Sequence, residues 1–454
     1  MTPPKALNGY CGKLTVCPTL KEVNKMAKTT RRDFIKTGAG AAGAGLMLPV
    51  INRQAMGTTV VERLRDDLVA ENRTLVIIEL AGGNDPLNTL VPLQQYDIYA
   101  SFRSRIAIPK DQVLPLYGST TRGLTPNLSA LKPVFDAGKV AVVQNVHYPN
   151  PNLSHDGSRT VYYLGDPAGT SATSQLGWIG RHSALFGNKT NSLDTVGVGG
   201  VSRTLYSPGA KIAGINADAQ GDASGYSFQT DARYAGDRNN KIAAARVMDS
   251  STSTKPYQEL VETATIDAFN SADQVAAATA AYQSTIQYPT SPFSYGLKLI
   301  AKLASSTNPS LGTRVFYLSI GGFDTHADQI NDQPALHRTV AEGLKAFYDD
   351  LVAHNLADRT LVMIWSEFGR RVADNASNGT DHGTGNDIFC IGNRVRGGVY
   401  GPDPSLTNLQ NGNLAASQDF RAVYSTIIQG WFGNSVAEAA QVLNGNFNNL
   451  GFLS

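Results

Sequence analysis

Short, continuous apolar runs recur along the chain, and most of them end in a glycine-rich or polar turn. The strongest runs are Thr74–Leu80, Lys139–Val146, Arg314–Ile320 and Thr360–Trp365, with weaker ones at Leu193–Gly199 and Asp387–Gly392. A run of this length without polar alternation is typical of a strand that is buried on both faces, as in a parallel sheet. The pattern therefore predicts several buried, mainly parallel strands.

Helical periodicity appears between these runs. Pro334–Asn355 places Leu336, Val340 and Leu344 on one face, and Pro334 suits the first turn of a helix. Gly296–Ser305 and Asp419–Gly433 also have helical patterns. Strands that alternate with helices favour an α/β fold with a mainly parallel central sheet and helices on both faces.

Residues 202–290 interrupt this alternation. The segment is first rich in Asp, Gly and Asn and then rich in Ala, with helical stretches at Lys241–Met248 and Tyr257–Tyr282. We interpret it as a partly helical insertion or cap on a single α/β domain that spans residues 58–454. No internal repeat is visible.

The first 57 residues differ from the remainder. Thr29–Lys36, which contains Arg31 and Arg32, resembles the twin-arginine export consensus. The apolar run that follows, Gly38–Val50, is short and glycine-rich, whereas a membrane span needs about 20 apolar residues. We expect export through the twin-arginine translocase, a periplasmic or extracellular location, and no stable membrane span after the signal is removed. A disordered basic arm is the alternative.

The charge of the body changes the picture of its partners. The whole chain has 39 Lys and Arg against 37 Asp and Glu. Residues 1–57 hold nine of the former and two of the latter, which leaves 30 basic and 35 acidic side chains. A mildly acidic body argues against nucleic acid as a partner. Cys390 is the lone cysteine after the N-terminal segment, so the body has no disulfide framework.

Polar groups follow the predicted strands, where ligands gather in parallel α/β sheets. Carboxylates and imidazoles in this position suit a divalent metal such as zinc, manganese or calcium. We expect metal ligands at Asp85, Asp324, His326, Glu367 and His382. Asp324 and His326 stand two apart on one loop, a spacing that lets both bind one ion, whereas Asp85 after Gly82-Gly83 could instead cap a turn.

Ser154 and His155 follow the second strong strand. Ser154 would be a nucleophile at a helix N-terminus, where backbone amides favour an anion, or a simple N-cap. We expect His155 to act as a ligand or base, and Arg159 or Arg370 to bind the anion. We expect His337 and His354 at the surface, and structural roles for His147 and His182.

Together these residues resemble the bacterial family called domain of unknown function 1501. The stretches that carry the resemblance run in order along the chain: LAGGNDPLNTLVP (80–92), PNPNLSHD (149–156), GGFDTHADQ (321–329), WSEFGRR (365–371), GTDHGTGN (379–386), RGGVYG (396–401) and DFRAVY (419–424). That family is similar to the alkaline-phosphatase-like superfamily, which includes phosphatases and sulfatases.

The superfamily resemblance implies a metal-dependent hydrolase of a phosphate or sulfate ester. Asp85 would be its first-strand metal ligand, Ser154 its nucleophile and His382 its late histidine ligand. Phe368 stands where a second ligand, a histidine, is usual, which puts a complete two-metal site in doubt unless His155 takes its place. The alternatives are a non-catalytic secreted binding or surface-assembly protein that retains the fold, and a transferase that uses the same site.

Overall fold

The computed structural model describes residues 73–167, 175–224, 256–306, 311–415 and 417–454, together with isolated residues between 236 and 244. The twin-arginine motif and the helix expected at Lys241–Met248 lie outside the residues described, apart from 243 and 244. In the part of the chain that the structure covers, every helix is too short or too polar to cross a lipid bilayer.

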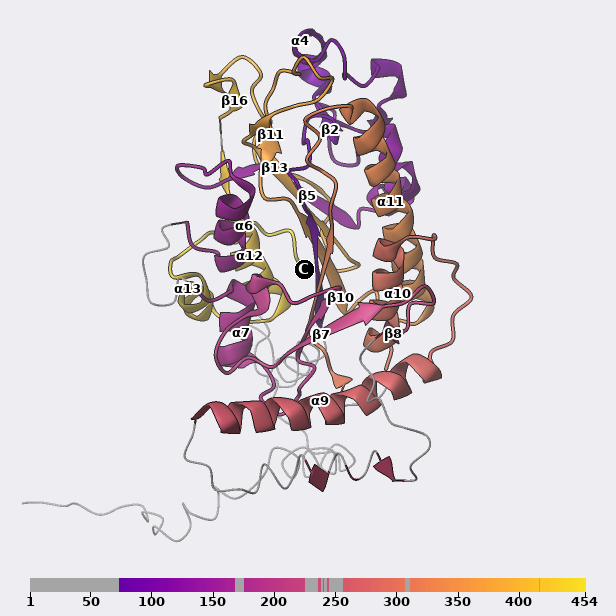
Figure 1. Ribbon diagram of the computed structural model, residues 1–454. Coiled ribbons are helices and arrows are strands. Elements are labelled where there is room, and N and C mark those ends of the chain that lie inside the picture. Colours follow the sequence, from indigo (N-terminus) through magenta and orange to yellow (C-terminus); the bar gives the residue numbers. More distant parts are fainter. Residues whose placement is uncertain are drawn as a thin grey trace, which may run out of the picture. The chain divides into compact units, whose positions relative to one another are not determined.

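A ten-stranded mixed sheet forms the centre of the described chain (Figure 1). Its inner strands are β1 (Thr74–Leu80), β9 (Val315–Ile320), β10 (Thr360–Trp365) and β6 (Thr195–Val198). These run parallel to one another, in the order β10-β1-β9-β6. The apolar runs thus form the predicted parallel strands, because residues buried on both faces need no polar alternation.

Outer strands complete the sheet. β13 (Asn386–Ile391) separates β10 from β5 (Val140–His147) and is antiparallel to both. On the other side, β7 (Ile212–Ala217) pairs in parallel with β6, and β8 (Ala223–Ser224) pairs antiparallel with β7. β14 (Gly398–Tyr400) and β17 (Gln418–Asp419) both pair in parallel with β5. β7 and β8 lie within residues 202–290, so this predicted insertion contributes two strands to the central sheet.

Helices cover both faces of the sheet, as Figure 1 shows. One face packs under α10 (Pro292–Ala304) and α11 (Gln329–Ala353), and α9 (Pro256–Ala281) packs against α10 and β8. The other packs under α6 (His155–Leu164), α7 (Trp178–Phe186), α12 (Arg421–Thr426) and α13 (Val436–Leu443). Residues alternate along β1: Val76 and Ile78 enter the first core, whereas Leu75 and Ile77 enter the second.

α11 begins earlier than its apolar periodicity predicts. The helix starts at Gln329, so Pro334 lies inside it rather than in its first turn. His337, which lies on this helix, faces the loop after β1, where its Nε2 lies 2.9 Å from Asn84 Oδ1. The prediction that His337 lies at the surface is therefore wrong, since the side chain is buried among polar groups.

The buried guanidinium of Arg370 ties together the loops at the carboxyl edge of the sheet. It donates to the carbonyls of Gly82 and Gly83 after β1, Phe323 after β9, and Thr380. Its Nη2 also lies 2.8 Å from Asp324 Oδ1. These acceptors come from three separate segments, so one side chain fixes the positions of all of them.

Three histidines in the described chain are deeply buried and neutral. Burial lowers the pKa of His147, His182 and His337 to about 4 in each case. Neither ring nitrogen of His147 finds a hydrogen-bond partner among the described residues. A proton on this ring would therefore be held in an environment that does not solvate it.

Replacing Arg370 with Lys should destabilise the fold. An ammonium cannot bond five acceptors arranged around a planar fork, and unpaired buried carbonyls are costly. We expect the free energy of unfolding to fall by about 3–5 kcal/mol, as measured by urea denaturation. Arg371→Lys is the matched control, because Arg371 is exposed and should tolerate the change within about 0.5 kcal/mol. Equal effects of the two substitutions would contradict the role of Arg370.

His147→Phe should make stability less dependent on pH. The pKa of His147 in the folded protein lies below its unfolded value of about 6.5. The neutral ring therefore contributes its full stabilisation above about pH 6.5, and this stabilisation is lost as the pH falls through about 4. The difference amounts to as much as about 3 kcal/mol. Urea denaturation at several pH values between 7.5 and 4 should therefore give a flatter profile for the variant. The control variant His354→Gln changes a half-buried histidine and should not flatten the profile of stability against pH.

Candidate metal centre

The centre has four side chains, which come from segments at the carboxyl edge of the sheet. His155 is the first residue of α6, shortly after β5, and Asp324 and His326 follow β9. His382 lies in β12 (His382–Gly383), which pairs with β11 (Gly369–Arg370). The sheet therefore brings together residues that lie up to 227 positions apart in the chain, from 155 to 382.

The Nε2 atoms of three histidines converge on the carboxylate of Asp324. His382 Nε2 lies 3.1 Å and His326 Nε2 lies 3.2 Å from Oδ1, while His155 Nε2 lies 3.3 Å from Oδ2. The two Nε2 atoms of His326 and His382 are 2.9 Å apart. Ligand atoms of His155, Asp324 and His382 all lie within 4.8 Å of one another. Such a cluster of imidazoles and a carboxylate can hold a transition metal.

The opposite nitrogen of each ring has an oxygen partner. His155 Nδ1 lies 2.9 Å from Glu367 Oε1, and His382 Nδ1 lies 2.7 Å from the carbonyl oxygen of Leu153. His326 Nδ1 lies 3.3 Å from Asp381 Oδ1. When a metal occupies the centre, an acceptor on Nδ1 would hold the proton there and leave the Nε2 lone pair free for the ion, the arrangement found around metal-bound histidines.

Asp324 is held in its charged form. Burial opposes the charge, but the hydrogen bonds from Arg370 and His382 outweigh it and lower the pKa of Asp324 to about 2. The side chain remains 46% exposed, so the carboxylate faces solvent while Arg370 behind it is buried. The hydrogen bond from Asn375, together with His326, also lowers the pKa of Asp381 below its ordinary value.

Glu367 lies behind the cluster. Its carboxylate is fully buried and accepts the backbone N–H of Gly82, at 2.9 Å and 3.1 Å from its two oxygens. Its remaining contacts are with Ser366 and His155. In this arrangement Glu367 orients His155.

Ser154 lies beside the cluster in the chain. It is the exposed N-cap of α6, and its Oγ accepts the backbone N–H of Gly157 at 3.3 Å. Its two neighbours both contact the cluster: the Leu153 carbonyl bonds His382, and the ring of His155 faces Asp324. The hydroxyl is thus accessible at the edge of the centre.

The two arginines that we expected to bind an anion lie in different surroundings. Arg159 pairs with Glu79 and keeps 33% of its side chain exposed. Arg370 is fully buried, and its donors are directed at backbone carbonyls and Asp324. The prediction that Arg370 is available to an anion is therefore wrong, because its guanidinium has no open face.

The structure does not bring Asp85 into the cluster. Its side chain is fully buried against Arg103, and it accepts from Gln329 Nε2 at 2.5 Å and from the backbone N–H of Leu87 at 3.1 Å. The Arg103 guanidinium supplies the positive charge that a metal would supply. Asp85 as placed here is therefore a structural anchor of the loop after β1.

Some residues at this edge have no counterpart in the sequence prediction. Asp381 directly precedes the predicted ligand His382, and it supports His326. Glu79 could have been identified from the sequence, because it is a charged residue within an otherwise apolar strand. Arg103 gave no such signal, because nothing in the local sequence pairs it with Asp85.

Several solved structures are similar to this chain. PsFucS1 sulfatase from Pseudoalteromonas sp. is 12% identical, with a TM-score of 0.37, and the match covers 87% of this chain and 75% of that one. The alkaline phosphatase from the Antarctic bacterium TAB5 is 12% identical, with a TM-score of 0.27, over 72% and 93%. The C-terminal periplasmic domain of EcEptC from Escherichia coli, in complex with Zn, is 12% identical, with a TM-score of 0.31, over 71% and 73%. These values are too low to carry the chemistry of those proteins to this chain.

None of the curated proteins matches this sequence. The sequence model of one family, described as "Protein of unknown function (DUF1501)", matches residues 143–424, which is more than half of the chain and includes the whole metal centre. The chain belongs to the DUF1501 family.

Proposed function

We propose that the protein is an exported, metal-dependent hydrolase of phosphate or sulfate esters. One observation carries the proposal: three histidine Nε2 atoms meet at the Asp324 carboxylate, and the Nδ1 atom of each ring has its own oxygen partner. Neutral imidazoles that are oriented in this way are the commonest ligands of catalytic transition metals. Export by the twin-arginine translocase is part of the proposal.

The separations of the three Nε2 atoms from Asp324 are close to those between the ligands of a tetrahedral ion. Ligand atoms about 2.0–2.1 Å from zinc lie roughly 3.3 Å from one another. The separations among His326, His382 and Asp324 are 2.9–3.2 Å, and that between His155 and Asp324 is 3.3 Å. Three imidazoles favour zinc, or manganese, over calcium, which prefers oxygen ligands.

Asp324 and the three histidines would hold the ion. A bound divalent ion would supply a Lewis acid that stabilises charge on a phosphoryl or sulfuryl oxygen. Arg370 keeps Asp324 ionised, and Glu367, Asp381 and the Leu153 carbonyl keep the three rings oriented.

Ser154 is the nucleophile in this proposal. Its oxygen bonds the phosphorus or sulfur, the ester oxygen leaves as an alcohol with the serine proton, and water then releases the inorganic anion and restores the hydroxyl. The N-terminus of α6 supports this assignment, since its free amides favour an anion beside the hydroxyl. Arg159, one helical turn after His155, lies on the same helix and can bind the anionic substrate.

A binding protein that retains the fold is the second candidate. Arg370 Nη2 approaches the same Asp324 oxygen as His326 and His382 do. This guanidinium competes with a cation for the carboxylate, and so it favours a weak metal site or none.

Metal content should depend on the cluster. After reconstitution, the purified full chain should contain about one divalent ion, as measured by plasma mass spectrometry. His382→Ala and Asp324→Ala should remove most of it. Glu367→Gln should weaken metal affinity by about 10- to 100-fold, because it removes the charged partner of His155.

His354→Ala is the matched control for metal content, since this histidine bonds carbonyls of Asp350 and Gln283 away from the cluster. Less than about half an equivalent of every divalent ion in the wild-type chain would contradict the metal centre.

Ser154→Asn should separate catalysis from helix capping. Asparagine is as good an N-cap as serine, but it provides no nucleophilic hydroxyl. We expect the variant to keep its melting temperature and metal, and to lose about a thousandfold or more of its activity toward nitrophenyl phosphate or nitrophenyl sulfate. Full activity in this variant would exclude Ser154 as the nucleophile.

A further inference from the structure

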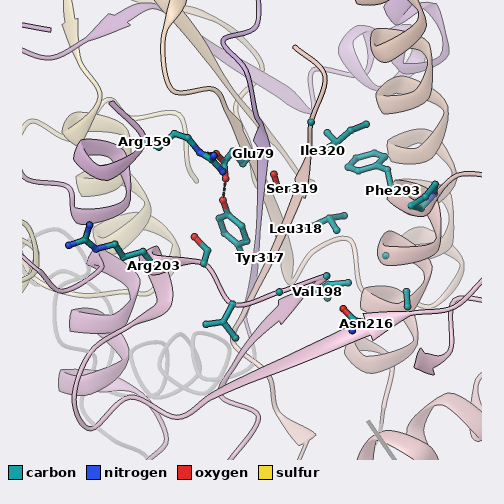
Figure 2. A pocket seen from close by; sticks show the side chains of 18 of the residues that line it. Glu79, Arg159, Val198, Arg203, Asn216, Phe293, Tyr317, Leu318, Ser319 and Ile320 are labelled. Carbon is teal, nitrogen blue, oxygen red and sulfur yellow. Dashed lines mark hydrogen bonds and ion pairs between the residues drawn. The ribbon is translucent and has the colours of Figure 1, made fainter. Parts of the chain in front are cut away.

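A cavity of about 820 Å³ opens beside the metal centre. Figure 2 shows it between α6, which carries Arg159, and α10, which carries Phe293. Its floor consists of the carboxyl ends of β1, β6, β7 and β9, at Glu79, Val198, Asn216 and Ser319. Pockets for small organic ligands have volumes of roughly 300–1,000 Å³, so the cavity can hold one.

The floor contains a buried carboxylate that the proposed reaction does not use. Glu79 is fully buried, and it accepts from Arg159 Nε at 2.6 Å, from Tyr163 at 2.8 Å and from Tyr317. Burial and the adjacent Glu79 raise the pKa of Tyr317 well above its ordinary value, so its hydroxyl remains a donor. The interaction with Tyr317 is visible in Figure 2.

This network holds Arg159 through its Nε atom alone. Nε bonds Glu79 and Tyr163, while Nη1 and Nη2 have no partner among the described side chains. The charge of Arg159 is balanced by Glu79. Arg203, on the same cavity wall, bonds Gln175 and Thr160 and pairs with none of the described acidic residues. The cavity therefore offers the Nη1 and Nη2 donors of Arg159 to a ligand, whereas the Arg203 guanidinium points away from it in Figure 2.

Other parts of the wall offer small hydrogen-bonding groups and open backbone. Hydroxyl and amide side chains come from Thr160, Ser202, Asn216, Ser291 and Ser319. A Cβ atom added at Gly199, Gly200 or Gly321 would meet no atom within 4 Å, so a ligand can approach the backbone there. Hydroxyls that both donate and accept, next to tyrosine and aliphatic surfaces, match a ligand with many hydroxyl groups on a carbon ring.

The cavity and the metal centre share two segments. His155 of the centre and Arg159 of the cavity lie one turn apart on α6, about 6 Å along the helix axis. Gly321, on the cavity wall, lies three residues before Asp324. A molecule of modest size can therefore reach both.

We propose that this cavity binds the sugar part of the ester whose phosphate or sulfate group lies at the metal centre. The inference rests on the proposed function and gives it a substrate class. Arg159, positioned by Glu79 and Tyr163, bonds the ligand between the two regions. A lipid chain would need a continuous apolar wall, whereas polar and apolar side chains alternate along this one.

Titration calorimetry on the metal-loaded full chain tests the inference. Glucose 6-phosphate and glucose 6-sulfate should bind at least about tenfold more tightly than inorganic phosphate and inorganic sulfate. Gly321→Trp should remove this advantage without changing affinity for the inorganic anions. Its backbone needs no positive φ, and the indole enters open space. Asn216→Trp fills the cavity from β7 and serves if the first variant does not fold.

Gly321→Ala and Val436→Trp are the controls. The first adds a methyl group in open space, and the second adds an indole on α13, at a residue that is 60% exposed and does not line the cavity. Both should retain the sugar preference. Equal binding of sugar esters and inorganic anions, or no binding of sugar esters, would overturn the inference.

Turnover assays separate this inference from the proposed function. A sugar preference that Gly321→Trp removes, in a chain that hydrolyses no ester, would support the cavity and reject the hydrolase. Ester hydrolysis with no sugar preference would support the hydrolase and reject the cavity.

Discussion

The hydrogen bonds of one buried guanidinium, that of Arg370, constrain the loops at the carboxyl edge of the sheet. Arg370 is fully enclosed, so each of its donors must find an acceptor inside the protein. It finds them in the loops after β1 and β9 and at Thr380, and it also holds Asp324. The positions of His326 and His382 depend on the same loops. An interaction that satisfies the backbone thereby also fixes the geometry of the metal centre.

Two carboxylates near this edge have contrasting surroundings. Asp85 and Asp324 each pair with a buried arginine, yet only Asp324 keeps an open face. The oxygens of Asp85 are taken by Arg103, Gln329 and a backbone amide, so no site remains for an ion. Those of Asp324 face three imidazole nitrogens and solvent. The same residue type thus anchors a loop in one case and offers a ligand in the other, because burial and partners differ.

In the proposed function, the candidate metal centre and the cavity would make different contributions to binding an ester substrate. The centre gathers imidazoles and one charged carboxylate, which suit a cation and, through it, an oxyanion. In the cavity, Glu79 balances the charge of Arg159, and the wall otherwise includes Arg203, hydroxyls and backbone. α6 joins the two, with Ser154 at its N-terminus, His155 in its first turn and Arg159 in its second. A single helix therefore relates the proposed nucleophile, a ligand and an anion-binding group.

Local patterns in the chain were enough to predict the parallel inner strands, the helices between them and the residue types at the strand ends, because apolar periodicity and turn residues are local signals. They also placed Asp324, His326 and His382 in one expected site, since parallel strands end at one edge. Tertiary structure alone decided that β13 runs antiparallel, that His337 is buried, and that Asp85 is enclosed by a buried arginine. The reason is physical: the role of a carboxylate or imidazole depends on which partner reaches it through space, and that partner can lie anywhere in the chain.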